Sequence, residues 1–368
     1  MFKSRFVPWG TLAPTDIPTN QFWLDVGGRN RGNVFDHHTD DGDSQCTVDL
    51  VIERFKGGYI RRTCQDIEFV THIQPDIDGI CSCWALNSLL EGRWIELPSW
   101  LYRLANRVRS HDQGLENDID VNKDWILWLS LEISLLGADD SKRVMRGFEV
   151  FDEIAVKLES GFSIFEMLFE PSEQAKNRMQ SEKRKFEADL LIGNLTEVEV
   201  PQRSSGDAKI IDALFIENPS SSLFKHFARR EKSTSPRGLG FQLLCVSKRH
   251  ELEDGQPPRW RHIISLPGNG SGTLKGLGQH LEEMERHFEA SVRTPLLNGR
   301  RRVPLGEGRF GGDIESPWYD GRGHGYAIVD SPAVEYKGQK ICASLIPPSE
   351  VKVAIFRLKE LAGSFDNQ

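Results

Sequence analysis

The sequence lacks the features that membrane and secreted proteins require. No apolar run approaches the roughly 18 residues that a membrane-spanning helix needs. The first nine residues lack the apolar core of a signal peptide. Six scattered cysteines in 368 residues are too sparse for a secreted disulfide scaffold. We therefore expect a cytoplasmic protein that has no membrane partner.

Strong positive charge and a nucleotide-binding P-loop are also missing. The net charge of -8 argues against a chain-wide electrostatic grip on nucleic acid. Two short basic patches, 229–232 and 300–302, remain as local candidates, although each is equally compatible with a solvated loop. The glycine-rich segment 268–276 lacks the spacing GxxxxGK[ST]. Any phosphate or nucleic-acid chemistry must therefore come from a local site.

The composition is that of a globular α/β protein. The apolar share of 38% and the charged share of 27% are typical of globular chains, and the length allows two domains. The segment 173–189 is helical in pattern but poor in apolar residues, which is typical of a solvated helix between domains. We predict a parallel-sheet domain over 1–192, including this helical linker, and a smaller α/β domain with a mixed sheet over 193–368.

A short loop after a predicted strand carries three metal-type ligands. The strand covers 67–71, and His72, Asp76 and Asp78 follow it before an apolar helical pattern begins at Ile80. The Gln-Pro step between them disfavours a helix through the loop. Residues that follow the carboxyl end of a strand lie where open α/β sheets place their sites. The loop is therefore a candidate site for a divalent metal.

Similar side chains end other predicted elements. Strands over 22–26 and 33–36 and a loop over 110–114 complete a set consisting of Asp25, Asp36, His37, His38, His72, Asp76, Asp78 and Asp112. Any one of them alone is more often a turn or surface residue, but their joint occurrence within 90 residues makes coincidence implausible. Imidazole and carboxylate without thiolate favour manganese, magnesium or iron over structural zinc. The ligands are too many for one ion and suit two. Cys81 and Cys83 are predicted to be small buried residues.

These motifs resemble the signature of the DHH phosphoesterase superfamily. That superfamily includes RecJ-type exonucleases, nano-RNA oligoribonucleases, cyclic-dinucleotide phosphodiesterases and family II pyrophosphatases. Asp36-His37-His38 is similar to its name-giving motif, and His72-x-x-x-Asp76-x-Asp78 to its first motif. Asp25-Val-Gly-Gly resembles the second motif, and Asp112 with Gly114 the fourth. In the superfamily the His-x-x-x-Asp-x-Asp motif comes first in the chain, so its later place here implies a circular permutation.

The resemblance implies a role for each residue. It implies that His72 and Asp76 hold one Mn²⁺ or Mg²⁺ ion, and that His37, Asp78 and Asp112 hold a second. Asp25 would bridge the two ions, His38 would face the substrate phosphate, and Asp36 would orient a histidine. The cofactor it implies is therefore two divalent cations per chain.

The second domain resembles the superfamily's accessory domain, which closes over substrate. The residues that would grip phosphate lie in a glycine-rich loop and are Arg309, Gly312, Arg322 and His324. Trp318 or Tyr319 is predicted to stack on a base.

The sequence leads to a main functional hypothesis and two alternatives. The main one is a two-metal phosphodiesterase, or nuclease, whose substrate is a nucleic-acid end, a short oligonucleotide or a cyclic dinucleotide. One alternative is a phosphatase or pyrophosphatase acting on a small molecule. The other is a non-catalytic DHH-like subunit that senses a nucleotide or acts as a scaffold in a larger complex. Whether the chain is a homo-oligomer is left open.

Overall fold

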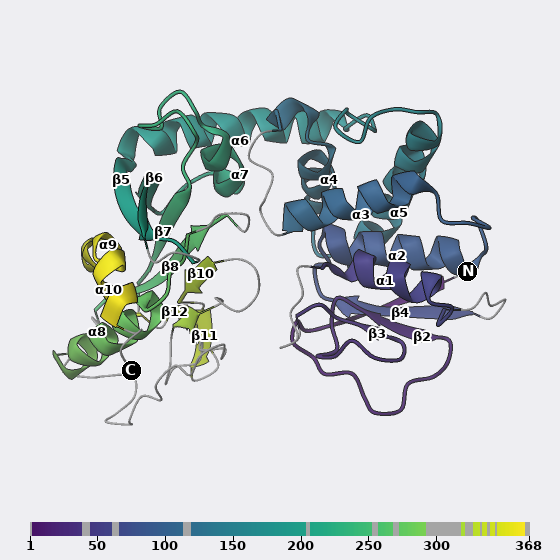
Figure 1. Cartoon of the computed structure of the whole chain (residues 1–368), viewed down its shortest axis with the longest axis horizontal. Coiled ribbons are helices and arrows are strands. Elements are labelled where there is room, and N and C mark those ends of the chain that lie inside the picture. The colour runs from purple at the N-terminus through teal and green to yellow at the C-terminus, as the bar shows by residue number, and fades with distance from the viewer. Residues whose placement is uncertain are drawn as a thin grey trace. The chain divides into compact units, whose positions relative to one another are not determined.

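The protein has an α/β fold that divides into two compact units (Figure 1). The structure is a computed structural model, and it describes residues 2–38, 45–60, 66–112, 119–203, 207–251, 257–267, 272–291, 318–320, 327–331, 333–336, 339–342 and 344–364. Unit 1 comprises Met1–Gln180 and unit 2 comprises Ser181–Gln368. The division falls inside helix α6 (Glu173–Ile192), whereas the sequence placed it at the end of this helix. Among the described helices, none is long and apolar enough to cross a membrane.

Unit 1 is built on a four-stranded sheet in which every strand is parallel to its neighbours. The strand order is β1-β4-β2-β3, and the strands are β1 (Phe2–Val7), β2 (Gln21–Leu24), β3 (Val34–Phe35) and β4 (Ile67–His72). The predicted parallel sheet is confirmed. Strand β1 was not predicted from the sequence, and it pairs with β4 from Phe2↔Ile67 to Val7↔His72. Since the strands are parallel, their carboxyl ends share one edge of the sheet.

Helices of unit 1 lie on one face of this sheet (Figure 1). They are α1 (Thr47–Lys56), α2 (Ile77–Leu90), α3 (Ser99–Asp112), α4 (Trp125–Ser134) and α5 (Asp140–Glu159). The sequence left residues 46–52 open between strand and helix. A capping box between Cys46 and Asp49 starts a helix there. On the other face, Ala13 and Ile17 of the segment 8–20 pack against Trp23 and Val34.

Helix α2 follows the loop that carries predicted metal ligands, and nearly all of its residues are buried. Asp76 caps its N-terminus by accepting a hydrogen bond from Gly79 N at 3.0 Å. Cys81 and Cys83 are buried in the helix, as predicted. Gly147 of α5 allows close packing, because a Cβ there would lie 2.3 Å from Ile80 Cγ2. Tight packing fixes α2 against the sheet and with it the loop before the helix.

Unit 2 contains a mixed six-stranded sheet in the order β5-β6-β7-β8-β10-β9. The strands are β5 (Asn194–Pro201), β6 (Ala208–Glu217), β7 (Leu243–His250), β8 (Arg259–Leu266), β9 (Tyr319–Asp320) and β10 (Ala327–Asp330). Strands β11 (Ala333–Tyr336) and β12 (Gln339–Cys342) form a separate hairpin. The predicted mixed sheet is confirmed, whereas β5 was missed.

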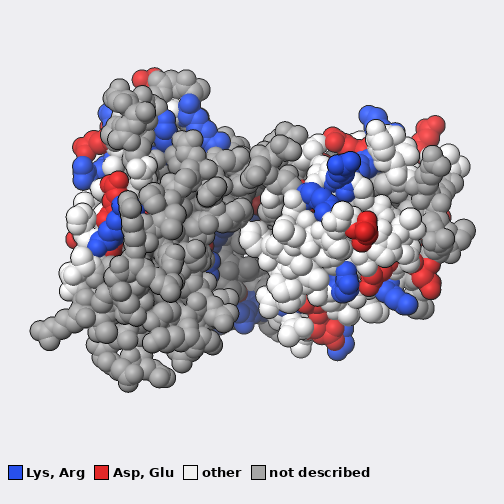
Figure 2. Space-filling model, turned by 90° about the horizontal axis from the view of Figure 1, so that it is seen from below, with Lys and Arg blue, Asp and Glu red and all other residues white. Residues whose placement is uncertain are grey.

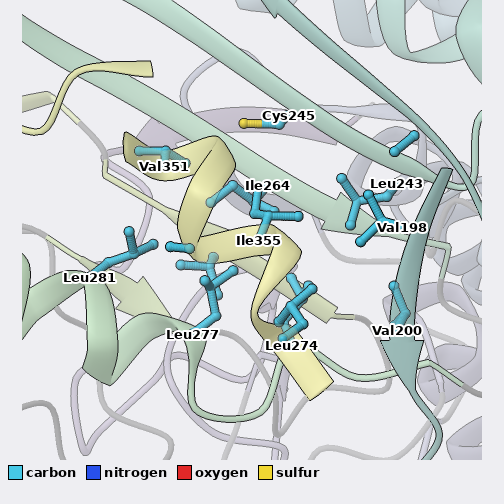
Figure 3. Close-up of a cluster of buried hydrophobic side chains, with 14 of the residues drawn as sticks. Val198, Val200, Leu243, Cys245, Ile264, Leu274, Leu277, Leu281, Val351 and Ile355 are labelled. Carbon is cyan, nitrogen blue, oxygen red and sulfur yellow. The ribbon is translucent and has the colours of Figure 1, made fainter. Parts of the chain in front are cut away.

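A hydrophobic core joins the sheet of unit 2 to its C-terminal helices (Figure 3). Helices α8 (Leu277–Ser291), α9 (Pro348–Phe356) and α10 (Leu358–Ser364) contribute to it. Leu281 and Ile355 pack there with Val200 and Ile264 of the strands. Residues 351–356 and 358–361 are helical, with Val351 and Ile355 buried on one face.

One face of the C-terminal half of α6 is packed, while its other face is exposed. Glu182 and Asp189 are buried, and their carboxylates accept hydrogen bonds from the backbone N–H groups of Ser220, Ser221 and Ser222. Phe186 contacts Phe224 of helix α7 (Phe224–Arg230). The expectation of a solvated helix therefore holds for one face only, because Glu182 and Asp189 serve as buried acceptors on the other.

Candidate metal centre

The predicted metal ligands of unit 1 lie together at the carboxyl edge of its parallel sheet. Asp25 follows β2, His37 and His38 follow β3, and His72 ends β4. Asp25 has a φ of 62° and Gly28 a φ of 71°. This left-handed backbone suits glycine and turns the chain sharply after β2. The turn lets the carboxylate of Asp25 remain at the sheet edge, where it is only 1% exposed.

The carboxylate of Asp25 lies between histidines from two different strands. Its Oδ1 is 3.2 Å from His37 Nε2, and its Oδ2 is 3.3 Å from His72 Nε2. Each oxygen therefore contacts a different imidazole. A carboxylate that bridges two cations offers one oxygen to each in this way.

Two groups of three ligand atoms share Asp25. One consists of Asp25, His37 and His38, and the other of Asp25, His72 and Asp76. Within each group the ligand atoms all lie within 4.8 Å of one another. Donor atoms at about 2.0–2.2 Å from one cation are roughly 3–3.5 Å apart, which matches the Asp25–histidine distances. The nitrogen and oxygen donors fit a manganese, magnesium or iron ion.

Asp78 and Asp112 approach the first group from further away. Asp78 Oδ2 is 3.7 Å and Asp112 Oδ2 is 4.0 Å from His37 Nε2. Both Asp78 oxygens also accept backbone hydrogen bonds at the start of α1, from Thr47 N at 2.7 Å and Val48 N at 3.1 Å. Asp112 was expected in a loop, but it ends α3. The helical pattern fades after Val108, which hid the last turn of this helix.

Asp36 holds the neighbouring histidine. Its Oδ1 accepts a hydrogen bond from His38 N at 3.0 Å and lies 3.1 Å from His38 Nδ1. Its Oδ2 accepts one from Gly28 N at 2.7 Å. These contacts fix the imidazole of His38. Its Nδ1–H points to the carboxylate of Asp36, so Nε2 is the ring nitrogen available to a ligand.

The charges of the centre are strongly coupled. Burial disfavours charge on Asp25, but hydrogen bonds with His37 and His72 outweigh this and hold the pKa of Asp25 well below its usual range. Burial alone would lower the pKa values of both histidines. The hydrogen bond with Asp25 and nearby carboxylates instead raise the pKa of His37 to about 10 and that of His72 to about 9. Protons thus fill positions beside Asp25 that cations would otherwise take.

Three residues that the structure places at the centre were not selected from the sequence. Thr47 Oγ1 donates a hydrogen bond to Asp25 Oδ1 at 3.1 Å. The buried hydroxyl of Thr71 lies beside the first turn of α2, 3.2 Å from where a Cβ on Gly79 would be. The ring of Trp9 lies edge-on to His38, with 5.6 Å between centroids. Only the start of α1 after Cys46 carried a signal, as a capping pattern that could have drawn attention to Thr47.

The sequence predicted further substrate-binding residues in the second domain. Arg309, Gly312, Arg322, His324 and the basic patch 300–302 lie outside the described residues. Trp318 was expected to stack on a base, but it is fully buried, stacks on His262 and donates to Glu285.

The basic patch 229–232 is not exposed along its whole length. Arg229 is 4% exposed, and its guanidinium donates to the carbonyl oxygens of Phe241 and Ser265. A structural role therefore explains this arginine. On the face of unit 1 seen in Figure 2, basic and acidic side chains are interspersed over a mostly uncharged surface. Among the described residues of that face, Lys and Arg do not form the continuous basic surface that grips long nucleic acid.

Comparison of the chain with family models, with curated proteins and with solved structures finds no match. The function is therefore argued from the geometry of the centre.

Proposed function

We propose that unit 1 is a metal-dependent phosphodiesterase of the DHH type, with two divalent cations held at the carboxyl edge of its parallel sheet. Its substrate is a nucleic-acid end, a short oligonucleotide or a cyclic dinucleotide. The observation that carries the proposal is the position of Asp25, whose two carboxylate oxygens contact imidazoles from two different strands.

Each cation has a set of ligands among these residues. His72 and Asp76 share one cation with Asp25, and His37 shares the other. Asp78 and Asp112 stand within 4.0 Å of His37 and complete the negative charge around the second cation. When bound, a pair of Mn²⁺ or Mg²⁺ ions neutralises phosphoryl oxygens and makes a water molecule acidic enough to attack phosphorus.

The chain's own part in the reaction is to hold the phosphate and the ligands in place. His38 donates from Nε2 to a phosphate oxygen, while Asp36 holds the opposite side of the ring. Burial would lower the pKa of His38, but the hydrogen bond with Asp36 and the charge of Asp25 raise it. The imidazole therefore holds its second proton more tightly than an ordinary histidine, which suits contact with an anionic substrate. Thr47 steadies Asp25 through the hydrogen bond to Oδ1.

The strand order supports a permuted DHH arrangement. The strands that precede the three motifs, β4, β2 and β3, are neighbours in one parallel sheet. A parallel sheet can be entered at a different strand without moving its loops in space. The change of motif order along the chain therefore does not separate the ligands of the proposed centre.

Hydrolysis of a labelled dinucleotide with Mn²⁺ tests the proposal. We expect release of 5′-mononucleotide that stops when a chelator removes the metal. Asp25→Asn is expected to abolish it, whereas Asp139→Asn, at an exposed helix cap, should not. Orthophosphate released from pyrophosphate, without mononucleotide release, would favour the small-molecule phosphatase. Absence of both metal binding and turnover would favour the non-catalytic subunit.

A further inference from the structure

An exposed indole stands at the rim of the candidate metal centre. Trp9 is 55% exposed, which is unusual for a side chain with so much apolar surface. Its ring lies edge-on to His38, with 5.6 Å between the ring centroids. The rings of His38 and His37 are in turn 4.0 Å apart. A planar group on Trp9 would therefore lie next to a phosphate held by His38.

The sheet fixes the place of this indole. Strand β1 ends at Val7, which pairs with His72, so the residues that follow it emerge at the ligand edge. A turn then forms in which Thr11 donates to Pro8 O from both its backbone N–H, at 3.1 Å, and its hydroxyl, at 2.6 Å. Gly10 supplies the positive φ of 79° that the turn needs.

Both ends of this turn are tied to the sheet. On one side Ile73 N donates to Val7 O at 2.8 Å, and on the other Ala13 N donates to Gly27 O at 3.0 Å. The turn is therefore anchored to the two loops that carry His72 and Asp25. An aromatic side chain on a rigid support loses little conformational freedom when it binds a partner.

We propose that Trp9 is a stacking platform for the nucleobase next to the phosphate at the metal centre. This inference rests on the proposed function and narrows it, because the substrate must then carry a planar base beside the scissile phosphate. Stacking on an indole tolerates any base, since each base offers a π-face. The substrate class is therefore nucleotides of any base, and sugar phosphates or pyrophosphate lack the group that Trp9 binds.

Binding of two probes tests the proposal without relying on turnover. The dissociation constants of AMP and ribose 5-phosphate are measured for the Mn²⁺-loaded protein by calorimetry. For Trp9→Ala we expect AMP to bind roughly 10-fold more weakly, as loss of one stacked base implies. Ribose 5-phosphate should bind unchanged, and Trp9→Phe should restore most of the AMP affinity. Tyr59→Ala is the matched control, because Tyr59 is 83% exposed and follows α1 at the end away from the centre.

Several results would overturn the stacking role. These are an unchanged AMP affinity in Trp9→Ala, an equal weakening of both probes, and a wild-type protein that binds AMP no better than ribose 5-phosphate. If hydrolysis depends on manganese but Trp9→Ala leaves AMP affinity unchanged, the stacking role is wrong and the proposed phosphodiesterase stands. If AMP binding depends on Trp9 but no hydrolysis occurs, the stacking role stands and the proposed phosphodiesterase is wrong.

Discussion

At the scale of single residues, the centre depends on one carboxylate and on the groups that orient its neighbours. Asp25 has its oxygens divided between His37 and His72. Asp36 has the supporting role, because it contacts His38 through both the backbone and the ring. Residues of these two kinds should respond differently to substitution.

Asp36→Asn should lower kcat/KM about 10- to 100-fold, the usual effect of losing a partner behind a functional histidine. An amide cannot stabilise the imidazolium as a carboxylate does, so the pKa of His38 should fall towards its ordinary value. Two Mn²⁺ ions should still bind. The rate–pH profile of the variant should therefore lose activity at a lower pH than the wild type. A profile of unchanged shape would contradict this role.

Metal binding should release protons and strengthen as the pH rises. The pKa values of about 10 for His37 and about 9 for His72 mean that both are protonated at pH 7 in the metal-free protein. A cation needs neutral imidazoles and ionised carboxylates, and burial together with the charge of Asp25 raises the pKa of Asp78 to about 8, so about three protons should leave per chain at pH 7. Calorimetry in buffers of different ionisation enthalpy measures this number. Binding without proton release would contradict the charge state described here.

The same shifts set the pH dependence of stability without metal. Both pKa values lie above the ordinary 6.5, so the folded state binds these protons more tightly than the unfolded state. Their contribution to the free energy of unfolding is full below pH 6.5 and is lost as the pH rises through 9 and 10. Denaturant titrations of the metal-free protein from pH 6 to 10 should show this loss, and Asp25→Asn should reduce it.

At the scale of elements, the start of α2 must approach the centre closely. A Cβ on Gly79 would lie 3.2 Å from Thr71 Oγ1 and 3.5 Å from Asp25 Oδ2. The contact with Thr71 would be tighter than ordinary van der Waals contact, so Gly79→Ala should shift the side chain of Thr71 beside Asp25 and weaken Mn²⁺ binding about 10-fold, even though alanine favours a helix. Gly363→Ala is the control, because nothing lies within 4 Å of a Cβ there. Equal metal affinities in both variants would contradict the close approach.

The sequence predicted the elements whose signal is local. The strands before Asp25, Asp36 and His72 were found, because each is a short apolar run followed by polar ligands. Strand β1 was missed because its half-exposed pattern is weak and its partner β4 lies some sixty residues away. Register with a distant strand cannot be read from a local pattern.

The residues of the site were likewise predicted only where their signal is local. Motif residues at strand ends were selected, whereas Thr47 and Trp9 reach the centre only through the packing of α1 and the pairing of β1. In α6 the acidic residues were expected to be solvated, but Glu182 and Asp189 are buried acceptors. Composition alone predicts such residues to be solvated.

At the scale of the whole molecule, the two compact units should differ in their response to metal. At 100 times its dissociation constant, Mn²⁺ should stabilise unit 1 by about 2.7 kcal/mol for each of the two ions and leave unit 2 unchanged. Arg229→Ala should destabilise unit 2 by about 2–3 kcal/mol, since it leaves buried carbonyl oxygens without a donor. Calorimetry should show two transitions that shift independently. A single transition moved by both changes would contradict this division.

The most direct test of the account is the number and coupling of bound Mn²⁺ ions. Titration followed by electron paramagnetic resonance should show two ions per chain with the exchange-coupled spectrum of a pair bridged by one carboxylate. In Asp25→Asn the coupled signal should disappear and the affinity for both ions should fall. A protein that binds a single uncoupled ion, or an Asp25→Asn variant that keeps the coupled pair, would contradict the central role of Asp25.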